Sequence, residues 1–107
     1  MKKFTTKEQT QCLIKLGFPG PCSISDFEEI VDYPGTTVIF DYDYSIGDLI
    51  EFLPKNEWAI FGSSEHIEIV TVHHELECGK CHTELIDALF DACVELKIKG
   101  VIDPMEE

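Results

Sequence analysis

One short stretch of the chain concentrates the residues that can do chemistry. It is the run His73-His74-Glu75-Leu76-Glu77-Cys78-Gly79-Lys80-Cys81-His82, which directly precedes the most helix-like segment. All four histidines lie between His66 and His82, and two of the five cysteines stand among them. Imidazole and thiolate groups are metal ligands and nucleophiles, so this run is the first candidate for a site.

The spacing of Cys78 and Cys81 is that of half a zinc site. Two thiolates three residues apart on a tight turn can hold one edge of a metal tetrahedron, and Gly79 permits the turn. The remaining ligands would come from the histidines. His73 and His74 are neighbours at an expected strand end and point to opposite sides, so at most one is well aimed. The pattern supports a zinc-binding module as one hypothesis, with these ligands: Cys78, Cys81, His73 and His82.

The same pair supports a second hypothesis, thiol–disulfide exchange. A strand, a Cys-x-x-Cys pair and a helix resemble the thioredoxin active-site motif, in which a helix N-terminus stabilises the thiolate of the first cysteine. By that resemblance Cys78 is the nucleophile and Cys81 the resolving thiol. Two departures stand against a complete thioredoxin fold. Only residues 99–107 follow the last helix, and Glu77 stands where those proteins have tryptophan.

Two further interpretations apply to this run. Cys78 to His82 spells the c-type haem attachment motif, with His82 as proximal and Met105 as distal ligand. Haem attachment normally requires export, and the residues after Met1 are polar where a signal peptide is apolar. The simplest interpretation is an exposed connection with incidental cysteines and no cofactor. No Ser/His/Asp order, phosphate-binding loop or zincin helix is present, so we do not expect an enzyme.

Acidity is the strongest bulk property of the chain. Its 107 residues carry 21 Asp+Glu against 8 Lys+Arg, a net charge of −13. That field repels phosphate backbones and anionic membranes, so direct nucleic-acid and membrane binding are not expected, whereas a basic protein surface is attracted. No run approaches the ~20 apolar residues of a membrane span. We therefore expect a cytoplasmic protein with reduced cysteines.

Periodicity predicts a helix and a strand in the first half of the chain. A capping box at Thr5 and Glu8 opens a helix over about Thr6–Leu16. Ser23–Tyr33 fits either a single helical turn or an irregular loop. Thr37–Tyr44 then alternates apolar and acidic residues, which predicts a half-buried strand. Its exposed face carries two carboxylates: Asp41 and Asp43.

The second half predicts a helix from Ser45 to about Pro54, a hairpin over Trp58–Phe61 and His66–His73, and a last helix over Thr83–Ile98. The last helix has the clearest apolar stripe, and we expect Ile67 and Ile69 to face the helices. Its opposite side is acidic and includes the following residues: Asp87, Asp91 and Glu95.

The predicted order is therefore helix, strand, helix, strand, strand, helix. It indicates a single α+β domain over residues 1–107, in which about 101–107 form a frayed tail. A small antiparallel or mixed three-stranded sheet would pack against two or three helices. The first strand can pair in either direction, so the strand order stays open.

Three segments carry a resemblance: Thr6–Gly17, Tyr44–Pro54 and Glu84–Phe90. Together they form one pattern that resembles small uncharacterised proteins of Bacteroides-type gut bacteria and their phages or mobile elements. The shared features are helix starts and core stripes, and the family has no established activity. The resemblance therefore implies an association with phages or mobile elements and no particular chemistry.

These observations favour a non-enzymatic accessory protein that binds a basic protein partner through acidic faces. Mimicry of the charge of DNA is one form that such binding could take. Three aromatic residues, Tyr42, Tyr44 and Trp58, fit either a dimer contact or the core, so the oligomeric state stays open. The expected acidic faces consist of the following residues: Asp41, Asp43, Asp87, Asp91 and Glu95.

Overall fold

The computed structural model describes residues 2–55, 57–63, 66–71 and 82–102 of the chain. Over these residues it has three helices and four strands. In chain order they are α1 (Lys7–Lys15), β1 (Ser23–Asp32), β2 (Gly35–Asp43), α2 (Ile46–Phe52), β3 (Trp58–Ser63), β4 (His66–Thr71) and α3 (Leu85–Ile98). The predicted α+β class is confirmed. None of the described helices is long and apolar enough to cross a membrane.

The arrangement of the strands differs from the single three-stranded sheet that we predicted. The described strands form two separate antiparallel pairs, β1 with β2 and β3 with β4. The difference arises at Ser23–Asp32, which is a strand and not a helical turn or loop. β2 pairs with its neighbour in sequence, β1, and does not join the β3–β4 pair. The turn between β1 and β2 contains Tyr33 and Pro34, which are joined by a cis peptide bond.

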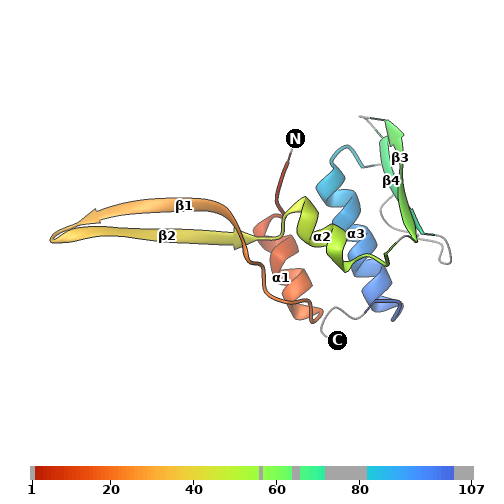
Figure 1. The fold of residues 1–107 in the computed structure, drawn as a ribbon, viewed down its shortest axis with the longest axis horizontal. Coiled ribbons are helices and arrows are strands. Elements are labelled where there is room, and N and C mark those ends of the chain that lie inside the picture. Colours follow the sequence, from red (N-terminus) through yellow and green to blue (C-terminus); the bar gives the residue numbers. More distant parts are fainter. Residues whose placement is uncertain (1, 56, 64–65, 72–81, 103–107) are drawn as a thin grey trace.

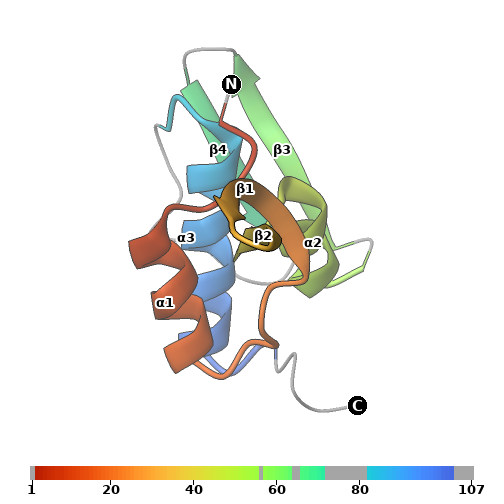
Figure 2. The same ribbon diagram turned by 90° about the vertical axis from the view of Figure 1, so that its left-hand side faces the viewer.

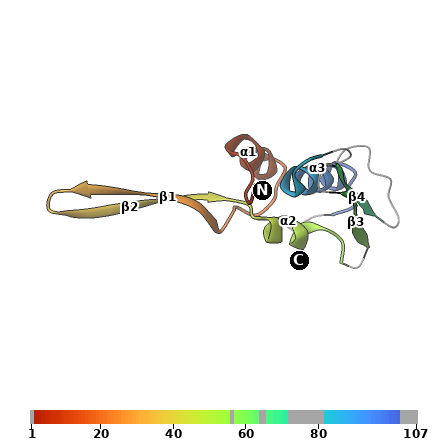
Figure 3. The same ribbon diagram turned by 90° about the horizontal axis from the view of Figure 1, so that it is seen from above.

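The β1–β2 hairpin projects from the rest of the molecule (Figure 1). The helices lie between this hairpin and the β3–β4 pair, as the view from above also shows (Figure 3). Seen end-on, α1 and α2 flank the base of the hairpin (Figure 2). The long dimension is 58 Å, and the radius of gyration is 15.9 Å. A compact chain of this length has a radius of gyration of about 13 Å, so the projecting hairpin dominates the shape.

The hydrophobic core lies in the body of the molecule, here named the helical body, which consists of the three helices with the β3–β4 pair packed against them. Its central element is α3, where the predicted stripe is confirmed because Leu89, Ala92, Cys93 and Leu96 are fully buried. From β4, Ile69 is buried and Ile67 packs against the core, as predicted. Among the described residues, the buried core includes none from Ile24 to Tyr42. It consists of Leu13, Phe18, Tyr44, Leu49, Leu53, Ile69, Ile86, Ala88, Leu89, Ala92, Cys93 and Leu96.

The helix starts agree with the sequence at α2 and differ by one residue at α1. Ser45 and Asp48 form the capping box that opens α2. The box of α1 is formed by Thr6 and Gln9, where we predicted Thr5 and Glu8. Thr5 is buried and instead joins the segment after β2. Its amide donates to the carbonyl oxygen of Tyr44 at 2.9 Å, and its hydroxyl accepts from the Tyr44 amide at 3.1 Å.

Candidate functional site

Most of the predicted metal site lies outside the described residues, including His73, Cys78 and Cys81. His82 is described, and its Nε2 atom lies 2.7 Å from Oδ2 of Asp91. Within the part of the chain that the structure describes, no group of three or more His, Cys, Asp or Glu side chains could hold a metal ion. The zinc hypothesis stays a prediction, which metal analysis before and after chelation would test.

The projecting hairpin is the feature that the sequence did not indicate. Residues directly opposite each other in an antiparallel pair point to the same face. The pairing joins Phe27 to Phe40 and Ile24 to Tyr42. A bulge at Ser25 shifts the register, so that Ile24 and Phe27 share one face although they lie three residues apart. One side of the hairpin, here named the apolar face, thereby carries Ile24, Phe27, Val31, Val38, Phe40 and Tyr42.

The apolar face is exposed to solvent. Phe27 is 62% exposed and Val31 is 79% exposed, and the other four members are between 43% and 48% exposed. The aromatic rings contact along the face, with 6.4 Å between the ring centroids of Phe27 and Phe40 and 6.5 Å between those of Phe40 and Tyr42. The alternation in β2 was therefore predicted correctly, but its apolar side is not buried against the body.

The opposite side of the hairpin, here named the acidic face, carries Asp26, Glu28 and Asp41 together with the exposed side chains of Ile30 and Ile39. Asp26 and Asp41 are direct cross-strand partners, an arrangement in which like charges destabilise the pair. The nearest cation is Lys7 of α1, whose Nζ lies 4.0 Å from Oδ1 of Asp41. Its hydrogen bond to Asp43 raises the pKa of Lys7, and burial opposes this rise. The charges of Asp43, Asp41 and Asp26 raise the pKa further.

The sequence around the hairpin explains why this face stays acidic. From Leu16 to Pro54 the chain contains no lysine, arginine or histidine. Any ion pair on the hairpin must therefore come from another segment, as Lys7 does, or from another molecule. The acidic residues of this stretch are Asp26, Glu28, Glu29, Asp32, Asp41, Asp43, Asp48 and Glu51.

Asp43 does not belong to an exposed face, which corrects our expectation for it. Its side chain is buried at the hairpin base, where it accepts from Lys7 at 2.8 Å, from Ser25 at 2.7 Å and from Thr10. Burial alone would raise the pKa of the Asp43 carboxyl. The hydrogen bonds from Lys7, Thr10 and Ser25, with the charge of Lys7, outweigh burial and hold that pKa below its ordinary value. Asp43 thus anchors the hairpin to α1.

The acids of α3 are likewise engaged within the body. Asp87 accepts from Lys2 at 2.8 Å and from Gln9 at 2.9 Å. Asp91 contacts His82, and Glu95 is buried with its carboxylate 3.5 Å from Nζ of Lys99. Of the five acids that we expected to bind a partner, Asp41 is the one whose side chain is more than half exposed. The partners of Asp41 on the acidic face, Asp26 and Glu28, were missed because their segment was not identified as a strand.

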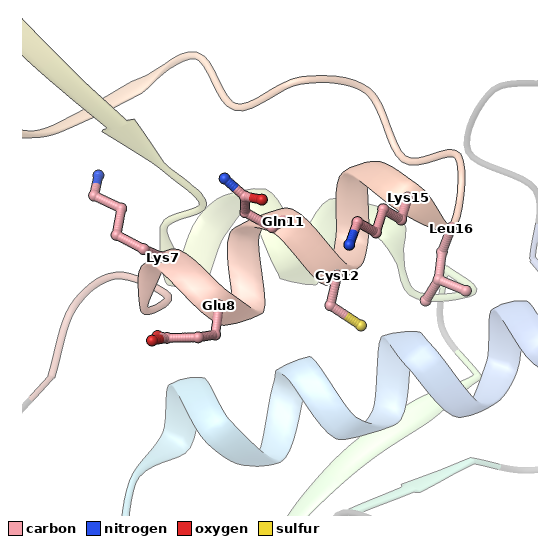
Figure 4. A pocket seen from close by; sticks show the side chains of 6 residues that line it. All are labelled: Lys7, Glu8, Gln11, Cys12, Lys15 and Leu16. Carbon is pink, nitrogen blue, oxygen red and sulfur yellow. The ribbon is translucent and has the colours of Figure 1, made fainter.

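A surface hollow of about 610 Å³ lies along α1 (Figure 4). Lys7, Gln11 and Lys15 point to one side of the helix, and Glu8, Cys12 and Leu16 point toward α3. All the described lining residues belong to this helix or to its C-cap, Leu16. The hollow is therefore open, with Cys12 as its one described thiol, and the hairpin remains the stronger candidate site.

Comparison of the chain with family models, with curated proteins and with solved structures finds no match.

Proposed function

We propose that the chain is a non-enzymatic binding domain that recognises a basic protein partner through the acidic face of the β1–β2 hairpin. The observation that carries the proposal is the direct cross-strand pairing of Asp26 with Asp41, on a hairpin whose own sequence has no basic residue. Two opposed carboxylates destabilise a strand pair, and a cationic side chain placed between them removes the repulsion.

The position of the hairpin suits this function. It extends away from the body (Figure 1), so a partner can approach its outer part from solvent, and at its base Asp41 adjoins Lys7 of α1. The net charge of −13 steers a basic surface toward the molecule before contact. Charge complementarity of this kind accelerates association and favours one class of partner.

The test is affinity capture with the purified chain immobilised, compared with the variant D26N/E28Q/D41N. The wild-type chain should retain a basic protein and release it when the salt concentration is raised, because exposed charge contacts are screened. The neutralised variant should not retain it. The matched control is E8Q/E51Q/E57Q, which makes the same change in net charge away from the hairpin and should retain the partner.

Two results would contradict the proposal. One is equal loss of the partner in both triple variants, which would assign binding to net charge alone. The other is retention that does not change with salt, which would assign binding to apolar contacts or to another surface.

A further inference from the structure

A partner bound to the acidic face would not cover the apolar face, so the apolar face needs a second binding partner of its own. The two faces point in opposite directions, so a basic partner on Asp26, Glu28 and Asp41 leaves Phe27 and Phe40 in water. Three aromatic and three aliphatic side chains at these exposures present on the order of 600 Å² of apolar surface. That area lies at the upper end of the largest patch on a typical monomer. A lone two-stranded hairpin is also only marginally stable in water.

We propose that a second copy of this chain covers the apolar face, so that two hairpins stack face to face in a twofold dimer. Among the residues of this face and their cross-strand partners there is one charged residue, Glu29, opposite Val38. The face therefore offers a basic partner almost nothing to pair with. An identical apolar face is a suitable partner, because a twofold contact places the same apolar patch of each copy against that of the other.

The pairing register supplies a consistent dimer geometry. The face has four rows of cross-strand pairs: Ile24 with Tyr42, Phe27 with Phe40, Glu29 with Val38, and Val31 with Thr36. A twofold axis between the second and third rows places the Phe27 row of each copy over the Glu29 row of the other. The first and fourth rows then also meet. All four rows are covered, and Glu29 lies at the β1 edge, where its carboxylate can reach water.

This geometry accommodates the high negative charge. With the apolar faces inside, both acidic faces lie on the outer sides of two sheets that pack about 10 Å apart. That spacing exceeds the screening length of about 8 Å at physiological ionic strength. The antiparallel stack also places the two helical bodies at opposite ends of the hairpins. Both acidic faces stay open to the basic partner of the proposed function, on which this inference does not rest.

The buried area is sufficient for a stable dimer. Two apolar faces together remove roughly 1,200 Å² from water, the lower end of the range for specific interfaces. Phe27 and Phe40, in the second row, lie next to the centre of this contact, where most binding energy is concentrated. A dimer that dissociates in the micromolar range is therefore expected, and it should tighten when salt screens the repulsion between the two copies.

The test is sedimentation analysis of the purified chain alone. The wild-type chain should have twice the mass of one chain, and F27S/F40S should weaken the dimer by at least about a hundredfold, because two central aromatic contacts are lost. The matched control is I30S/I39S, which removes two exposed apolar side chains from the opposite face and should leave the dimer intact. E29V should tighten the dimer. Unchanged fluorescence of Trp58 would verify that each body is folded.

A wild-type chain that stays monomeric at several hundred micromolar would overturn the proposal, and so would equal weakening by F27S/F40S and I30S/I39S. The dimer test contains no basic partner, so its failure leaves the proposed function standing. Conversely, the variant D26N/E28Q/D41N, in which only the acidic face is changed, should no longer bind the basic partner and should remain dimeric. High salt should weaken partner binding and strengthen the dimer, which separates the two contacts in a single titration.

Discussion

The Nζ atom of Lys7 lies 2.8 Å from Oδ2 of Asp43, which joins α1 to the end of β2. The same carboxylate accepts from Ser25 in the bulge of β1. Nearby, Ser23 donates to Asp48 in the capping box of α2 at 2.6 Å. These polar contacts fix the hairpin at its base. Farther along, the apolar face is free to meet another molecule.

The first prediction is that Asp43 contributes more than Lys7 to the free energy of unfolding. Asp43 is buried, and D43A would remove the carboxylate that accepts from Thr10 and Ser25, which leaves Ser25 only the carbonyl oxygen of Asp41 as an acceptor, so we expect a loss of about 2 kcal/mol in the free energy of unfolding. K7A should have a smaller effect, because the Lys7 side chain is 59% exposed. Urea unfolding of both variants measures this. An equal or larger effect of K7A would contradict the role assigned to Asp43.

The second prediction is a loss of stability in acid that depends on Asp43 and Asp87. Burial would raise the pKa of the Asp87 carboxyl, but the hydrogen bonds from Lys2 and Gln9 and the charges of Lys2 and His82 hold that pKa below its ordinary value of 3.8. The pKa of Asp43 is lowered in the same sense. As the pH falls, the unfolded chain takes up these protons first. The stability that these groups contribute is present above pH 3.8 and is lost as the pH falls through that value toward the lower folded-state pKa.

Urea unfolding of the wild-type chain and of D43N at a series of pH values measures this effect. The difference between the two chains should be full at neutral pH and should shrink below about pH 4. Comparing the two chains cancels the general relief of repulsion that acid gives to a chain of net charge −13. A difference that is independent of pH would show that folding does not lower the pKa of Asp43.

The positions of the helices could be predicted from the sequence because their signals are local. Ser45 and Asp48 specify the start of α2 within four residues, and the stripe through Leu89 and Leu96 specifies the buried side of α3. At α1, two consecutive threonines could each cap the helix. Thr6 does so because Thr5 is held by Tyr44.

The hairpin could not be predicted in the same way. In β1 the pairs Glu28-Glu29 and Ile30-Val31 interrupt the alternation of a strand, and the bulge at Ser25 shifts its phase. Alternation in β2 shows which side is apolar, but not what covers that side. A half-buried strand was therefore predicted, with Tyr42 left open between the core and a dimer contact, and the core includes neither Phe40 nor Tyr42. The absence of basic residues from Leu16 to Pro54 was the one sequence signal for the acidic face.

The third prediction is a loss of stability at high pH. Burial raises the pKa of the Cys93 thiol from 9.0 to about 12, and burial with the charges of Asp48 and Cys22 raises the pKa of Tyr44 from 10.0 to about 12. The unfolded chain therefore ionises first as the pH rises. The stability is fully present below pH 9 and is lost between about pH 9 and pH 12.

The variant Y44F separates these contributions. The Tyr44 hydroxyl donates to the carbonyl oxygen of Pro19, so Y44F should lower the free energy of unfolding by about 1 kcal/mol at pH 7. Above pH 10 its stability should fall less steeply than that of the wild-type chain, because one ionising group is absent. Parallel curves for the two chains above pH 10 would contradict the burial of this hydroxyl.

The fourth prediction is that the helical body folds without the projecting part of the hairpin. Among the described residues, the buried core includes none between Ile24 and Tyr42. The hydrogen bonds that anchor the base come from Ser23, Ser25 and Asp43, outside the segment 26–41, and within that segment Asp41 lies 4.0 Å from the exposed Lys7. Joining Ser25 to Tyr42 through an Asn-Gly turn should therefore lower the free energy of unfolding by less than about 1 kcal/mol.

The comparison must be made at a protein concentration below the dissociation constant of the wild-type dimer, because dimerisation stabilises the folded chain. Under that condition the shortened chain should unfold in one cooperative transition close to that of the wild type. It should also be monomeric and should not bind the basic partner, because both faces of the hairpin are gone. A shortened chain that does not fold would show that the hairpin contributes to the folding of the body. The hairpin would then be part of the folding unit as well as a binding arm.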